Sequence, residues 1–125
     1  MRAKRSPKDM CQIFCFNEAV VNRLRANLPA EEDLNRAAER FSTMGSRTRL
    51  LMLYCLSQAD ELCVCDIATS LRMNLSTVSH QLRVLRSAGL VRFRNEGKIT
   101  FYRLADSETG DLLRSELERA VATVS

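Results

Sequence analysis

Apolar residues recur at helical spacing from residue 17 to residue 57. The first series starts after Asn17 and stops at Pro29, which predicts a first helix; its members are Val20, Leu24 and Leu28. An acidic first turn precedes the second series, which Gly45 ends; its members are Leu34, Ala37, Ala38, Phe41 and Met44. Ser46 is expected to cap a third helix, whose apolar members are Leu50, Leu53, Tyr54 and Leu56.

A helix-turn-helix is predicted in the middle of the chain. Residues 60–71 begin with two acids and run into Ile67, Ala68 and Leu71, which favours a short fourth helix followed by a turn at 72–75. Ser76 is expected to cap a fifth helix that ends at Ala88-Gly89, and its apolar stripe consists of Val78, Leu82 and Leu85. Two short helices joined by a four-residue turn form a helix-turn-helix candidate.

Beyond Gly89 the apolar pattern changes from helical to alternating. Apolar positions flank Asn95-Glu96-Gly97 on both sides, which predicts a β-hairpin closed at that turn. A hairpin directly after the second helix makes the motif winged. The predicted fold class is therefore mainly α with a small β-hairpin wing, a winged helix-turn-helix.

The last segment is helical again, with more apolar surface than one terminal helix can bury on so small a core. Its apolar members are Leu112, Leu113, Leu117, Ala120, Val121 and Val124. The surplus predicts a homodimer. Since residues 1–16 have no sustained period, we divide the chain into an N-terminal arm (1–16), a winged helix-turn-helix domain (17–105) and a C-terminal dimerisation helix (106–125).

Composition and charge narrow the function. The chain has 125 residues, 46% of them hydrophobic, and neither an apolar run of membrane-spanning length nor an apolar signal core, so we expect a cytoplasmic protein without a membrane partner. Residues 72–103 carry seven basic residues and one acidic residue, whereas the net charge of the whole chain is only +4. This concentration of positive charge predicts a polyanionic partner, and on a helix-turn-helix that partner is double-stranded DNA.

Polar residues opposite the buried stripe of the fifth helix suit base edges, because Gln pairs with adenine, Arg with guanine, and the Thr methyl contacts thymine. The predicted DNA-binding residues on this helix are Ser76, Thr77, Ser79, His80, Gln81 and Arg83. On the wing, Arg92, Arg94 and Lys98 are expected to contact phosphates. The single histidine has no acidic partner within one turn, and no catalytic motif is present, so the sequence predicts no enzyme.

Cysteines supply the remaining candidate chemistry. Cys11 and Cys15 are spaced C-x3-C, and Cys63 and Cys65 C-x-C at the predicted start of the fourth helix, where thiolates favour metal over proton. Four thiolates suit thiophilic ions such as cadmium, zinc, lead and mercury. The same thiols leave open a redox response through disulfide formation, and also arsenite or antimonite binding, for which three thiols suffice. Cys55 lies in an apolar run and is expected in the core.

Two stretches resemble the ArsR/SmtB family of winged-helix metal-sensing repressors, most closely its cadmium/lead-responsive CadC branch. Residues 61–68 (ELCVCDIA) match the metal-box motif of that family, followed at the appropriate distance by residues 76–82 (STVSHQL); residues 10–18 resemble the CadC arm. The resemblance covers roughly residues 10–105.

The resemblance implies a homodimer that binds operator DNA without metal. Cys11 and Cys15 of one subunit would join Cys63 and Cys65 of the other, and cadmium, lead or another thiophilic ion (zinc, bismuth, mercury) would release the DNA. CadC proteins carry a second, zinc-type site on their C-terminal helices. Here Asp106 is kept, but the other three aligned positions hold Glu108, Arg119 and Ala122, so we expect the second site to be lost.

Overall fold

A computed structural model describes residues 17–124 of the backbone, with side chains up to Ala122. The predicted arm, with Cys11 and Cys15, lies outside the described residues. The chain divides into two compact units, residues 1–34 and 35–125, and each is described by itself.

In the first unit, the predicted first helix is present as α2 (Glu18–Ala26). Its N-cap is Asn17, whose side-chain oxygen accepts a hydrogen bond from the Val20 amide at 3.1 Å. Leu28 was expected on this helix, but the helix ends earlier, at Ala26. The residue before a proline is disfavoured in the helical region, which explains why Leu28, next to Pro29, lies outside it.

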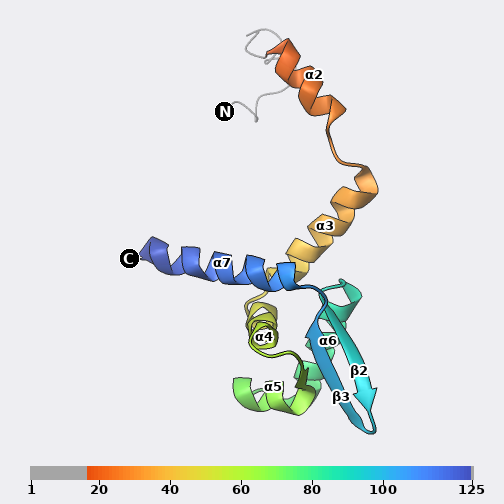
Figure 1. The fold of residues 1–125 in the computed structure, drawn as a ribbon, viewed down its shortest axis with the longest axis vertical. Helices are drawn as coiled ribbons and strands as arrows, with labels where there is room; N and C mark the ends of the chain where they lie inside the picture. The colour runs from red at the N-terminus through yellow and green to blue at the C-terminus, as the bar shows by residue number, and fades with distance from the viewer. Residues whose placement is uncertain (1–16, 125) are drawn as a thin grey trace. The chain divides into compact units, whose positions relative to one another are not determined.

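The second unit contains the predicted winged helix-turn-helix (Figure 1). Its helices are α3 (Glu31–Met44, which begins in the first unit), α4 (Arg47–Ser57), α5 (Val64–Leu71), α6 (Leu75–Ser87) and α7 (Ser107–Val124). Its antiparallel sheet has the order β1-β3-β2, with β1 (Leu62–Cys63), β2 (Val91–Glu96) and β3 (Ile99–Leu104). The buried core joins these elements; its members are Met44, Met52, Leu53, Leu56, Ile67, Ala68, Val78, Leu82, Leu85, Leu90, Val91, Tyr102 and Leu113.

The N-cap of α6 is Asn74, not Ser76 as expected. The Asn74 side-chain oxygen accepts hydrogen bonds from the backbone amides of Ser76 and Thr77, at 2.8 and 3.3 Å. Asn is as good a cap as Ser, and it stands two residues earlier, so the helix begins at Leu75. Before it, Arg72 ends α5 in the left-handed conformation, with φ of 55°.

The sheet differs from the prediction at two places. Residues 62–63 form a short strand, β1, where a helix was expected, because they pair with Tyr102 and Phe101 of β3. The hairpin turn is Gly97-Lys98 rather than 95–97, since Glu96 still pairs with Ile99. Gly97 has φ of +63°, the conformation that a two-residue hairpin loop needs at its first position.

α7 carries several exposed apolar side chains in the single chain. Leu113 is 2% exposed, whereas Leu112, Leu117 and Val121 are 44, 41 and 67% exposed. Phe41 on α3 is 63% exposed. None of the helices in residues 17–124 is long and apolar enough to cross a membrane.

Candidate DNA interface and metal centre

α6 presents a polar face because its apolar stripe is fully buried: Val78, Leu82 and Leu85 have no exposed surface. Four of the six predicted DNA-binding residues of this helix are exposed; they are Ser76, Thr77, His80 and Arg83. The other two, Ser79 and Gln81, are half-buried. The first turns of α6 therefore expose four polar side chains of types that can contact DNA.

Gln81 is engaged inside the protein. Its Oε1 accepts a hydrogen bond from Nη1 of Arg49 at 2.9 Å, and Nε of Arg49 donates to the Thr43 carbonyl at 2.7 Å. Arg49 was not among the predicted site residues. No periodic signal could have found it, because the contact joins residues 32 positions apart on different helices.

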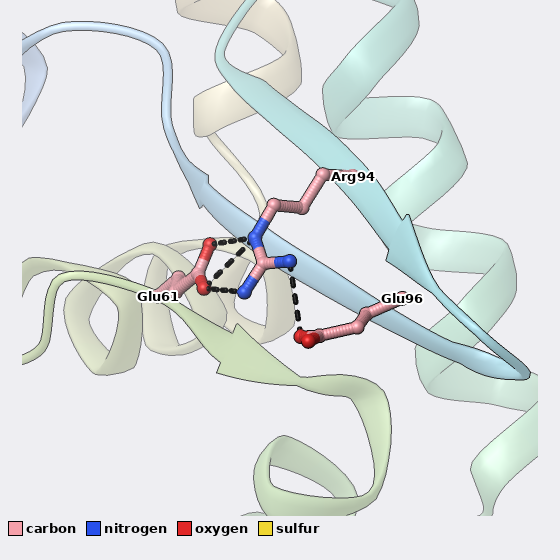
Figure 2. A network of polar contacts seen from close by, with 3 residues as sticks. All are labelled: Glu61, Arg94 and Glu96. Atoms are coloured by element: carbon pink, nitrogen blue, oxygen red, sulfur yellow. Dashed lines mark hydrogen bonds and ion pairs between the residues drawn. The ribbon is translucent and has the colours of Figure 1, made fainter.

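On the wing, the predicted phosphate ligands fall into two groups. All three are exposed: Arg92, Arg94 and Lys98. Arg94 differs in that it lies between two carboxylates (Figure 2): its Nε is 3.0 Å from both carboxylate oxygens of Glu61, and its Nη1 is 3.1 Å from Glu96. Its guanidinium carbon also lies 4.7 Å from the centre of the Phe101 ring. The hydrogen bonds lower the pKa of Glu61 and raise the pKa of Arg94, so both groups stay charged.

The C-x-C pair straddles the start of α5. Cys63 ends β1 and is the N-cap of the helix, with extended backbone (φ −80°, ψ 161°) and no hydrogen bond from its side chain as a cap. Cys65 lies in the first turn and is exposed, whereas Cys63 is half-buried. Because Cys63 is not helical, the wide separation of helical i and i+2 side chains does not apply to this pair. Within residues 17–122, no cluster of three or more His, Cys, Asp or Glu side chains could hold a metal ion.

Cys55 on α4 is half-buried rather than a member of the core. Burial raises the pKa of its thiol, which favours the protonated form. It lies on a different helix from the C-x-C pair.

Asp106, the retained residue of the second metal site implied by the resemblance, caps α7. Its Oδ1 accepts hydrogen bonds from the backbone amide and the hydroxyl of Thr109, at 2.8 and 2.9 Å, and these bonds lower the pKa of Asp106. Arg40 lies 3.9 Å away and lowers the pKa further. A structural role thus accounts for this carboxylate without a metal.

Comparison with known proteins identifies the family. The family described as "Bacterial regulatory protein, arsR family" matches residues 46–92, which span α4 to the first strand of the wing. A cadmium resistance transcriptional regulatory protein CadC homolog from Staphylococcus aureus is 34% identical over 119 residues, covering 94% of this chain and 98% of the relative. An arsenical resistance operon repressor from Bacillus subtilis is 31% identical and covers 69% of this chain and 82% of its own.

Solved structures agree with this assignment. The solution structure of a homodimeric winged helix-turn-helix DNA-binding domain from Mycobacterium bovis superposes with a TM-score of 0.64 at 34% identity, covering 78% of this chain and 90% of that one. Family, fold and motif order therefore coincide: the chain belongs to the ArsR family of bacterial regulatory proteins.

Proposed function

We propose that this protein is a cytoplasmic transcriptional repressor, not an enzyme, that binds operator DNA as a metal-free homodimer and releases it when a thiophilic metal binds. The proposed ligands are Cys11, Cys15, Cys63 and Cys65, and the proposed inducers are cadmium and lead. The observation that carries the proposal is the position of Cys63, which is the N-cap of α5 and also the last residue of β1, the strand that pairs with β3 of the wing.

The DNA-binding part rests on the exposed polar face of α6 and on the wing. Residues 76, 77, 79, 80, 81 and 83 would read bases, since their side chains include the donors and acceptors that match base edges in the major groove. Arg92 and Lys98, which are exposed, would contact phosphates. Arg94 would contact a phosphate only after its ion pair with Glu61 breaks.

The homodimer is supported by the exposed apolar side of α7. Leu112, Leu117 and Val121 would be covered by a second copy, which would also place two copies of α6 for two half-sites. The Mycobacterium bovis domain of the same fold is homodimeric.

The metal part rests on thiol chemistry. Soft thiolates select cadmium, lead, mercury and related ions over magnesium or calcium. Cys63 and Cys65 provide two of them on one short segment, and the CadC homolog from Staphylococcus aureus is a cadmium resistance regulator. Four thiols favour cadmium, whereas arsenite needs only three. Because an arsenical resistance operon repressor from Bacillus subtilis is among the relatives of this chain, arsenite is the competing candidate for the inducer.

The link between metal and DNA runs through β1. Cys63 pairs with Phe101 in the sheet, and Glu61, two residues before Cys63, holds Arg94 on the wing. A metal that pulls the two thiols together would displace β1 and α5, and α5 packs against α6. A small displacement would then move both the wing and α6 out of their positions for binding DNA. The metal-bound state would therefore bind DNA more weakly than the metal-free state.

The test uses a labelled duplex that the protein selects from a random-sequence pool. Metal is titrated into the protein–duplex complex, and fluorescence anisotropy reports release of the duplex. Cadmium should release the duplex at one ion per complete thiol site, whereas magnesium at the same concentration should not. Release by arsenite and not by cadmium would transfer the proposal to the arsenite class. Release by a mild oxidant alone, reversed by a reductant, would support the redox alternative, and no sequence-selective binding at all would contradict the proposal.

A further inference from the structure

Arg49 lies on α4, and its side chain joins α3 to α6 through hydrogen bonds. Its backbone amide donates to the Ser46 hydroxyl at 3.3 Å, within the cap of α4. Its Nε donates to the Thr43 carbonyl at 2.7 Å, near the end of α3. Its Nη1 donates to Oε1 of Gln81 on α6 at 2.9 Å. The contact with the Thr43 carbonyl thus fixes the guanidinium, which can then orient the Gln81 side chain.

The chemistry of the two groups determines which end of the Gln81 amide faces outward. A guanidinium has only donors, so the amide must turn its carbonyl oxygen toward Arg49. The NH2 group, with two donors, then occupies the other end of the amide. The flipped amide would set its NH2 group against the guanidinium, donor against donor, so the orientation with the oxygen toward Arg49 is preferred.

Gln81 also lies at the border of the reading face. Four residues before the buried Leu85, it is displaced from that residue by only about 40° around the helix, at roughly 100° per residue. It is half-buried, whereas its neighbour His80 is exposed. An amide at this border can touch Arg49 with its oxygen while its nitrogen remains free for a ligand outside the protein.

We propose that Arg49 is a positioning residue that makes Gln81 a determinant of base specificity, presenting hydrogen-bond donors to the DNA. The proposal rests on the DNA-binding function proposed above. Purines fit such a group, because adenine and guanine both present the N7 acceptor in the major groove. Cytosine fits worst, since its groove edge offers only an amino donor. Gln81 should therefore prefer a purine and reject cytosine at one position of each half-site.

The experiment measures binding of the selected duplex and of its single-base variants, at fixed salt, for wild type and five variants. Gln81→Ala should flatten the preference at one position per half-site, a loss of roughly tenfold in discrimination. Arg49→Met should flatten the same position, and the double variant should add little to Gln81→Ala, because both act through one contact. Arg47→Met is the matched control: this arginine is exposed, lies in the same turn of α4, and should leave the preference unchanged.

Gln81→Glu gives the sharpest result. The carboxylate can still pair with Arg49, but it has no donor, and a carboxylate accepts from the cytosine amino group. The preference at that position should therefore move from purine toward cytosine. Thermal unfolding of each variant identifies any general loss of folding, and Arg49→Lys replaces Arg49→Met if the latter is unstable, since one ammonium cannot keep both contacts of the guanidinium.

An Arg49 with a merely structural role would weaken all duplexes alike and leave the ratios between them unchanged. That result, or unchanged base preferences in both Gln81 variants, would overturn the proposal while DNA binding itself stands. If wild type selects no sequence at all, the proposed function fails as well.

Discussion

Glu61 and Arg94 connect the thiol-bearing segment to the wing. Nε of Arg94 lies 3.0 Å from both oxygens of the Glu61 carboxylate, although the two residues are 33 positions apart. Glu61 precedes Cys63 by two residues, and Cys63 pairs with Phe101, whose ring lies under the same guanidinium. A basic side chain of the wing is therefore held by the segment on which the proposed metal acts.

Glu61→Gln should raise the affinity of the metal-free protein for DNA of any sequence, by about threefold to tenfold at low salt. The change removes a negative charge beside the wing and frees Arg94 for a phosphate, so the salt dependence should steepen by up to about one unit. Binding to the selected duplex and to random DNA over a salt series checks both effects. Glu116→Gln makes the same charge change on α7, beside Arg119, and should have little effect. Unchanged affinity in Glu61→Gln would mean that Arg94 gains no phosphate contact.

Cys63→Ser and Cys65→Ser should each abolish release by cadmium while leaving binding of the metal-free protein near wild type. Both thiols lie on the segment before and at the start of α5, not on the exposed face of α6. Cys55→Ser is the matched control, because its thiol is half-buried on α4, and release should persist in that variant. The check is the anisotropy titration described above, and normal cadmium release in either of the first two variants would contradict the ligand assignment.

A mixed dimer tests whether the site spans two subunits, as the resemblance implies. One chain carries Cys11→Ser and Cys15→Ser, and the other carries Cys63→Ser and Cys65→Ser. If the arm reaches the partner, the mixture forms one complete site and one without thiols, so thiolate-to-cadmium absorption should reach half the wild-type value per mixed dimer. Absence of this absorption in a mixture proven to exchange subunits would place all four ligands in one chain.

Asp106→Ala should destabilise the fold without affecting metal release, since the carboxylate caps α7. Loss of an N-cap costs about 1 kcal/mol of the free energy of unfolding at neutral pH. Because the pKa of Asp106 is lowered in the folded state, its charge stabilises the fold above the ordinary aspartate pKa of about 4 and stops doing so as the pH falls through the lower folded value. The difference from wild type should therefore shrink in acid.

Denaturant unfolding at neutral and acidic pH measures this effect, with Glu108→Ala as the control, because Glu108 is an exposed carboxylate in the first turn of the same helix. A zinc-dependent loss of DNA binding that disappears in Asp106→Ala would instead reveal a working C-terminal site, which the replaced positions 108, 119 and 122 argue against.

Local patterns predicted most of the fold. The stripe of Val78, Leu82 and Leu85 located α6 and its polar face, because a buried stripe determines which residues point outward. The strand β1 was not predicted, because two residues are too few to show an alternating pattern. Leu62 and Cys63 are extended only because β3 pairs with them. The cap of α6 was misplaced because Asn74 and Ser76 are both good caps and only the backbone distinguishes them.

The candidate interface was predicted less completely, for a related reason. Sequence spacing shows which side chains leave a helix on one side, but not which of them find partners in the protein. Gln81 with Arg49, and Arg94 with Glu61, are tertiary contacts that become visible only when distant segments are brought together. Both contacts involve residues that had been assigned to DNA from their type and position alone.

The most direct test of the central claim is to measure the affinity of cadmium for the protein with and without the selected duplex. Thiolate-to-metal absorption reports how much cadmium is bound. Coupling between two ligands is reciprocal, so if cadmium releases DNA, bound DNA must weaken cadmium binding by the same factor, typically about 5- to 150-fold. We expect that weakening in wild type and in Cys55→Ser. Equal cadmium affinity with and without DNA, at full occupancy of the thiols, would contradict the claim that metal at Cys63 and Cys65 controls DNA binding.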